Sequence, residues 1–275
     1  MCGLVLAACT SDTLTEAGTP PTFAGADPNR SAMAVDVIDG DTIDVQFPDG
    51  RIDRVRLLGI NTPEDGECYS TEATEELERL VVGEAVVLVA DESDRDQYHR
   101  LLRYVENDGA DVSALLVRDG FAVVVVREPD VARNGVLRQL EGEARTSERG
   151  LWNPSACGPA RGQASQLAIA GLRLDADGDD AQNLNDEWVE VQNTGAVPAD
   201  MTGWGVRDES SSHRFTFPAS FTLDGGALVR IHSGCGTESA DELFWCTSGS
   251  AIWNNDGDTA FLVDPSGNIV RRVAG

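Results

Sequence analysis

Carboxylates and arginines at the edges of short apolar runs are the residues of this sequence that could do chemistry. Asp39 and Asp41 flank a glycine in the stretch IDGDT, where aspartate and glycine favour a tight turn. Arg56 and Glu64 stand at the two ends of the stretch RLLGINTPE. Hard carboxylate oxygens suit a divalent cation such as Ca²⁺, and a guanidinium suits a phosphate. Taken one at a time, each residue is better explained by a turn, a surface ion pair or the first turn of a helix.

A third stretch, DQYHRLLRYV, adds Arg100 two residues after Tyr98. Two guanidinium groups can bind the oxygens of one phosphodiester bidentately. The three stretches therefore predict a phosphate site, provided that the fold brings Arg56, Glu64 and Arg100 to one place.

The elements that must position these residues can be read from the spacing of apolar side chains. The alternation of Ile43, Val45 and Phe47 with polar residues predicts a strand, and Ser70 is placed to cap a helix. Further strands are predicted at 52–58, 84–90 and 101–105, and helices at 70–83, 112–120 and 131–147. With the strand that precedes the IDGDT turn these make five short strands. Together with about three helices they indicate a mainly β fold with some α, a closed barrel of the OB type.

Five stretches of this part resemble one known family. IDGDT, RLLGINTPE, DQYHRLLRYV, VSALLVRDGFA and RGLWN occur in this order and at near-matching spacing in the staphylococcal nuclease (thermonuclease) family. The resemblance covers residues 33–157 and implies an OB-fold domain that hydrolyses phosphodiester bonds of DNA or RNA. It also implies Ca²⁺ as the cofactor, although another divalent cation could serve.

The resemblance assigns roles to individual positions. Arg56 and Arg100 match the two catalytic arginines of the family, and Glu64 matches its general base. Tyr98 is expected to contact the substrate. The positions that match or neighbour the metal ligands are Asp41, Asn61, Thr62 through its backbone carbonyl, and Asp39 as a nearby acid.

Some positions depart from the family pattern. Asn61 stands where the staphylococcal enzyme has a second carboxylate ligand, so metal binding is expected to be weaker. Val126 and Arg127 stand where that enzyme presents a tyrosine to the nucleotide, and its flanking lysines are absent. The alternative to an enzyme is therefore a non-catalytic surface binding or adhesion module with a degenerate nuclease barrel.

The composition limits how nucleic acid could be bound. The formal net charge is −26, and all 21 basic residues are arginine. Non-specific affinity for nucleic acid comes from basic side chains that release counterions, so this acidic surface disfavours it. A DNA or RNA substrate would be gripped locally. No apolar run is long enough to span a membrane.

The first residues suggest export. The stretch LAAC, ending at Cys9, resembles a bacterial lipobox, which makes residues 1–9 a partial lipoprotein signal and Cys9 the lipidated residue. Residues 10–32, rich in Thr, Pro, Gly and Ala, read as a flexible linker. The expected location is the bacterial cell surface or the extracellular space, with membrane contact only through a lipid anchor. The other interpretation is a frayed N-terminus with a chance cysteine.

Four further cysteines could form disulfides in an exported protein. Cys68, Cys157, Cys235 and Cys246 allow three pairings. Their positions favour Cys68 with Cys157 and Cys235 with Cys246, and the alternative is four inert buried thiols.

The remainder of the chain has a different pattern. After a Pro- and Gly-containing linker at 158–165, short alternating runs separated by turns predict a C-terminal β-sandwich over 166–275. The stretches NDEWVEVQNTG, MTGWGVRDES and WNNDGDTAFLVDPSGNIV resemble the lamin tail domain, which implies an immunoglobulin-like fold. Such a domain could bind a cell-envelope or extracellular ligand. No feature indicates an oligomer.

Overall fold

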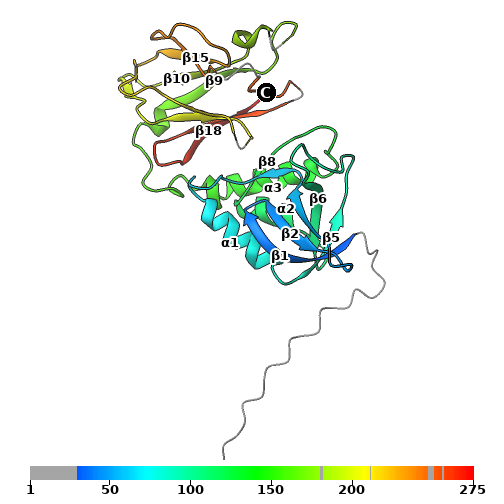
Figure 1. Ribbon diagram of the computed structural model, residues 1–275. Coiled ribbons are helices and arrows are strands. Elements are labelled where there is room, and N and C mark those ends of the chain that lie inside the picture. Colours follow the sequence, from blue (N-terminus) through cyan, green and yellow to red (C-terminus); the bar gives the residue numbers. More distant parts are fainter. Residues whose placement is uncertain (1–29, 180–181, 211, 247–250, 256) are drawn as a thin grey trace, which may run out of the picture.

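The computed structural model describes residues 30–179, 182–210, 212–246, 251–255 and 257–275, which form two domains packed end to end (Figure 1). Cys9 and most of the predicted linker 10–32 lie outside these residues. The linker prediction is wrong at its end, because the first strand begins at Ser31. Ser31 and Ala32 are buried and pair with Val87 and Val86, so these small residues belong to the sheet.

A closed five-stranded barrel forms the N-terminal domain, as the sequence predicts. Its strands are β1 (Ser31–Asp39), β2 (Thr42–Gln46), β3 (Ile52–Leu57), β5 (Ala85–Val89) and β6 (Leu101–Asn107). They are hydrogen-bonded in the order β3-β2-β1-β5-β6, and a parallel pairing of β3 with β6 closes the barrel. Short β7 (Ala110–Asp111) pairs antiparallel with the end of β6. Short β4 (Ile60–Asn61) pairs with β8 (Val123–Val124) outside the barrel.

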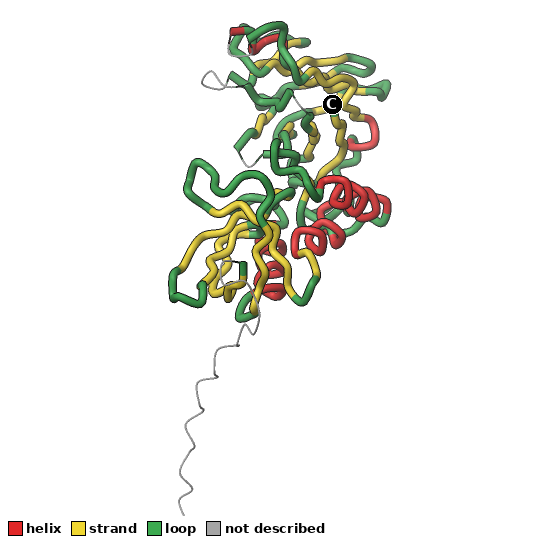
Figure 2. Tube along the Cα trace, turned by 90° about the vertical axis from the view of Figure 1, so that its right-hand side faces the viewer, coloured by secondary structure: helices red, strands yellow, loops and turns green. Residues whose placement is uncertain are grey.

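Three α-helices pack against the barrel, also as predicted (Figure 2). They are α1 (Ser70–Val81), α2 (Val112–Asp119) and α3 (Asn134–Thr146). Ser70 is the first residue of α1 and not its cap, because Tyr69 takes the cap position with φ 73°. No helix in the described ranges is long and apolar enough to cross a membrane.

The C-terminal domain is a β-sandwich, in agreement with the sequence. One sheet has the order β16-β15-β10-β9 and the other β13-β12-β17-β18, with β11 and β14 as a separate pair. The strands are β9 (Leu167–Arg173), β10 (Trp188–Asn193), β11 (Ala199–Asp200), β12 (Gly205–Arg207), β13 (Arg214–Thr216), β14 (Thr222–Leu223), β15 (Leu228–His232), β16 (Glu242–Phe244), β17 (Thr259–Val263) and β18 (Ile269–Ala274). Apolar side chains of both sheets, such as Val189, Val206 and Leu262, share one core.

Two disulfides confirm the predicted pairing. Cys235 is bonded to Cys246 within the sandwich. Cys68, just before α1, is bonded to Cys157, which lies after the barrel in the segment that leads to the second domain. The backbone N–H of Cys157 donates to the side chain of Asn268, at 2.8 Å. The disulfide with Cys68 ties the connecting segment to the first domain, and the hydrogen bond to Asn268 ties it to the second.

The two domains share an interface with an apolar centre and buried charges. Trp152 of the first domain and Phe261 on β17 belong to one buried cluster, with ring centroids 6.4 Å apart. Arg272 on β18 pairs with Glu141 on α3 at 3.2 Å, and only 2% of Glu141 is exposed. Figure 1 shows β18 on the side of the sandwich that faces α3 and β8. The domains are therefore joined by packing as well as by the chain.

One interface carboxylate predicts a pH-dependent stability. Glu209 accepts hydrogen bonds from Thr259 and from the N–H of Val126, and burial raises its pKa to about 7. Because the pKa is raised from 4.5, its stabilising contribution is complete below pH 4.5 and is lost as the pH rises through 7. Between pH 5 and pH 8 this loss should be roughly 2 to 3 kcal/mol.

Urea unfolding of the wild type and of Glu209→Gln at both pH values measures this effect. The glutamine cannot titrate, so its stability should fall less between pH 5 and pH 8. Equal slopes in the two proteins would show that Glu209 is ionised throughout this range.

Candidate active site

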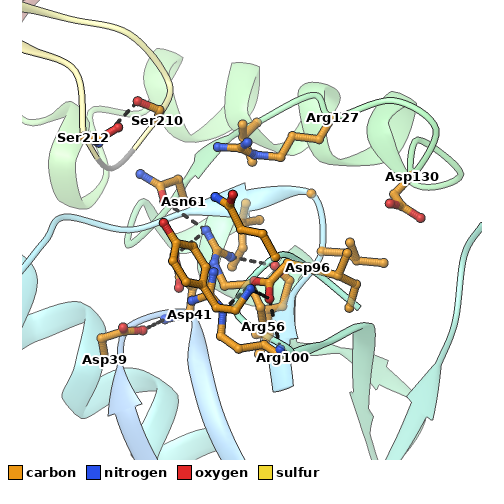
Figure 3. A pocket seen from close by; sticks show the side chains of 18 of the residues that line it. Asp39, Asp41, Arg56, Asn61, Asp96, Arg100, Arg127, Asp130, Ser210 and Ser212 are labelled. Atoms are coloured by element: carbon orange, nitrogen blue, oxygen red, sulfur yellow. Dashed lines mark hydrogen bonds and ion pairs between the residues drawn. The ribbon is translucent and has the colours of Figure 1, made fainter. Parts of the chain in front are cut away.

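The residues that the sequence predicts to act together line one cavity of about 510 Å³ (Figure 3). Its wall includes Asp39, Asp41, Arg56, Asn61, Glu64, Tyr98 and Arg100. Thr62 is 3% exposed and lies just behind the wall. The structure therefore brings three separate stretches of the barrel domain to one place.

Arg56 is held firmly at the base of this cavity. It lies on β3, where one guanidinium nitrogen donates to the carbonyl of Leu57 at 2.7 Å. The other terminal nitrogen lies 2.9 Å from the Asn61 amide oxygen and 2.9 Å from the Asp41 carboxylate. Burial lowers the pKa of Arg56, and the nearby Arg100 and Arg127 lower it further. Mutual repulsion of these cations is relieved by an anion between them, as a phosphate would be.

Asp41 lies in the turn between β1 and β2. The backbone of this turn approaches Thr62 closely at Gly40. A side chain at Gly40 would meet the Thr62 hydroxyl at 2.7 Å, so only glycine fits. The N–H of Thr62 donates to Asp41 at 3.1 Å, and Asp39 accepts from the Asp41 N–H at 3.0 Å. Burial raises the pKa of Asp41 to about 6, although Arg56 opposes the shift.

The oxygen atoms around Asp41 fit a hard divalent cation. Among the described residues, no three His, Cys, Asp or Glu side chains form a metal-binding group. The oxygens that line the cavity here are instead the carboxylates of Asp39 and Asp41 and the Asn61 amide, a mixture that Ca²⁺ accepts. Arg56 alone does not offset the burial of Asp41 and the repulsion from Asp39, so a further positive charge would stabilise the site. The amide nitrogen of Asn61 is buried without a hydrogen-bond partner.

Arg100, directly before β6, lines the same cavity. Its Nε donates to Asp96 at 2.6 Å, and Asp96 also accepts from the backbone N–H of Arg100. The guanidinium carbon lies 5.4 Å from the centre of the Tyr98 ring, and Tyr98 is 70% exposed. Asp96 thus orients the guanidinium of Arg100 through its Nε, and the exposed ring of Tyr98 lies beside it.

Glu64 follows Pro63 at the rim and has the environment of a proton acceptor. Burial raises the pKa of Glu64, and the negative charges of Asp39 and Glu67 add to the rise. A carboxylate whose pKa moves toward neutrality accepts a proton more effectively at neutral pH. Its backbone N–H donates to the Glu67 carboxylate at 3.0 Å.

The cavity also has lining residues that the sequence analysis did not predict as functional. Arg127 adds a third guanidinium, which Figure 3 shows reaching toward Asn61 and Arg56. Ser210, Ser212 and His213 come from the C-terminal domain. For Arg127 the available signal was its position where the staphylococcal enzyme presents a tyrosine to the nucleotide. For the three residues of the sandwich there was none, because nothing in the sequence relates the sandwich to the barrel.

A closed five-stranded barrel with arginines and acidic side chains over one cavity has the architecture of an OB-fold domain that binds phosphate groups. Residues 54–154 match the model of the family described as staphylococcal nuclease homologue. Residues 161–274 match that of the lamin tail domain. An endonuclease of Escherichia coli O157:H7, described as uncharacterized, is 37% identical over 120 residues, which are 43% of this chain and 74% of that protein. The chain belongs to the staphylococcal nuclease family, and a lamin tail domain follows its nuclease-family domain.

Two proteins of Bacillus subtilis strain 168 are also similar. Endonuclease YncB is 37% identical over 126 residues, 43% of this chain and 59% of that protein. The SPbeta prophage-derived endonuclease YokF is 36% identical over 124 residues, 42% of each. The matched region thus spans about half the length of these two relatives.

Proposed function

We propose that this protein is an exported, metal-dependent nuclease that hydrolyses phosphodiester bonds of DNA or RNA. The observation that carries the proposal is the convergence of Arg56, Arg100, Glu64 and Asp41 on one cavity. The relatives whose names include the word endonuclease support it.

The chemistry follows from the charges in the cavity. A phosphodiester is an anion that repels an incoming nucleophile, and the guanidinium groups of Arg56 and Arg100 offset this repulsion. Arg56 is fixed by Leu57, Asn61 and Asp41. Arg100 is fixed by Asp96. Donors that are already in place stabilise the charge of the transition state without reorganising.

Glu64 supplies the remaining step. Its carboxylate, with a pKa raised by burial, accepts the proton of the attacking water as the water oxygen bonds to phosphorus. The P–O bond to the leaving sugar oxygen breaks in the same displacement, and that oxygen takes a proton from solvent. A Ca²⁺ ion held by Asp41, Asp39, Asn61 and Thr62 would add positive charge beside the phosphate oxygens. Tyr98 and Arg127 line the same cavity, which supports contacts of both side chains with neighbouring parts of the nucleotide.

Digestion of single- and double-stranded DNA and of RNA by the purified protein tests the proposal. Cleavage should require Ca²⁺ or Mg²⁺ and stop when EDTA is added in excess, whereas EGTA should stop only the Ca²⁺-supported reaction. Asp41→Asn keeps the shape of the side chain and removes its charge, and should lower the rate by roughly tenfold or more at fixed Ca²⁺. Since the chain carries a net charge of −26, added salt should lower KM by screening repulsion from the substrate.

Two outcomes would contradict the proposal. No cleavage by the wild type in either cation at any salt concentration would favour a binding module with a degenerate barrel. Equal activity of the wild type and Asp41→Asn would indicate a contaminating nuclease. Export and the lipid on Cys9 are tested separately, by cell fractionation and by the mass of the N-terminal peptide.

A further inference from the structure

The wall of the nuclease cavity is built from both domains. Ser210, Ser212 and His213 precede β13 of the lamin tail domain and line the same cavity as Arg56 and Arg100. Figure 3 shows Ser210 and Ser212 on a segment across the cavity from Asp39 and Arg100. The second domain therefore reaches the place where the proposed chemistry occurs.

Ser210 and His213 are held in place by a buried carboxylate. Asp208, which is 3% exposed, accepts hydrogen bonds from the N–H and the hydroxyl of Ser210 at 2.9 and 2.7 Å. Its other oxygen lies 2.7 Å from a ring nitrogen of His213. The hydrogen bond to Asp208 raises the pKa of His213, which favours the charged pair.

Arg214, the first residue of β13, connects this segment to the barrel. Its Nε and one terminal nitrogen donate to the two carboxylate oxygens of Glu67, at 2.5 and 3.1 Å. The remaining terminal nitrogen donates to the carbonyls of Ser210 and His213, at 2.8 and 3.1 Å. One guanidinium thus binds both domains in a planar, bidentate arrangement that lysine could not reproduce.

Glu67 also binds the backbone of Glu64. The Glu67 oxygen that accepts from the terminal nitrogen of Arg214 also accepts from the backbone N–H of Glu64, at 3.0 Å. In return the N–H of Glu67 donates to the carbonyl of Glu64, at 2.8 Å. Burial would raise the pKa of Glu67, but the hydrogen bonds from Arg214 lower it overall. The carboxylate therefore stays ionised and acts as a strong acceptor for Glu64.

We propose that the lamin tail domain completes the active site, with Arg214 as a positioning residue that acts through Glu67 to hold the backbone of Glu64. The inference rests on the proposed function, because it assigns a task to the second domain within that same site. Without Arg214, Glu67 would lose the partner that orients it, and the turn that carries Glu64 would gain freedom. A small displacement of a reacting group is costly for catalysis.

Kinetics of three variants test this positioning role in the full-length protein. Arg214→Ala should lower kcat by about tenfold with little change in KM, because Arg214 does not touch the substrate. Glu67→Gln keeps an oxygen acceptor for Glu64 and should lose less. As a matched control, Arg230→Ala removes another ion pair of the same domain, to Glu190 at 2.5 Å, and should leave kcat unchanged.

Hydrogen exchange at the Glu64 amide supplies a readout that does not depend on activity. The amide should exchange several-fold faster in Arg214→Ala than in the wild type, and at the wild-type rate in Arg230→Ala. The exchanged pair Glu67→Arg with Arg214→Glu can restore the link between the domains. This double variant should not restore kcat, and its Glu64 amide should still exchange faster than in the wild type, because arginine at position 67 has no acceptor for the Glu64 N–H.

The outcomes separate this inference from the proposed function. If the wild type cleaves and Arg214→Ala has wild-type kcat and Glu64 exchange, the positioning role is overturned. A rise in KM alone would assign Arg214 to substrate binding and overturn it as well. If the wild type does not cleave, the proposed function fails, whereas Glu64 exchange still decides whether Arg214 holds the turn.

Discussion

Replacement of Arg100 by alanine is expected to lower kcat for nucleic-acid cleavage by about two to three orders of magnitude. The side chain faces the cavity and is fixed by Asp96 through Nε, which leaves its terminal nitrogens for a phosphate. Its removal takes away a charged donor that is already oriented. Single-turnover rates at saturating substrate measure the loss in the chemical step.

Arg103→Ala is the matched control for this experiment. Arg103 lies on β6, three residues after Arg100, and pairs with Asp94 at 2.5 Å, but it does not line the cavity. Its replacement removes the same charge from the protein and should leave kcat near the wild-type value. Equal losses in the two variants would show that the effect comes from the strand or from net charge, not from the site.

Glu64→Gln is expected to lower kcat by roughly two to three orders of magnitude. The amide keeps the size of the side chain and leaves the backbone contact with Glu67 in place, but it cannot accept the proton of the attacking water. Folding should be unaffected, so thermal unfolding of the variant should match the wild type. The change in kcat then reports on proton transfer.

Asp65→Asn makes the same charge change one residue away, on an exposed side chain that does not line the cavity. It should keep wild-type kcat. If Glu64→Gln also retained most of its activity, the general base would have to be another group or solvent, and Glu64 would be left as a structural carboxylate of the turn.

Much of the barrel and its site follows from local patterns. The alternation of apolar and polar residues in 43–47 and the apolar faces of the helices are set by residues close together in the chain. Such local patterns can be read directly from a sequence. Arg56, Glu64 and Arg100 were predictable because they lie in stretches whose order resembles a known family. The pairing of Cys68 with Cys157 followed from their positions along the chain.

Other features depend on contacts between distant residues and left no local signal. Strand β1 was missed in part because Ser31 and Ala32 are small residues in a run that reads as linker, yet their burial comes from pairing with β5. The contact of Arg214 with Glu67 joins residues 147 positions apart. Nothing near either residue indicates a partner in the other domain.

The buried cluster that Trp152 forms with Phe261 has a consequence for how such a protein can evolve. Modules joined by a loose tether can be shuffled freely, since neither needs to recognise the other. Here a replacement sandwich would have to supply an aromatic side chain for Trp152 and a cation for Glu141. The two domains are therefore expected to be inherited as a pair. A barrel domain expressed alone would expose the apolar surface around Trp152 to solvent and would tend to aggregate.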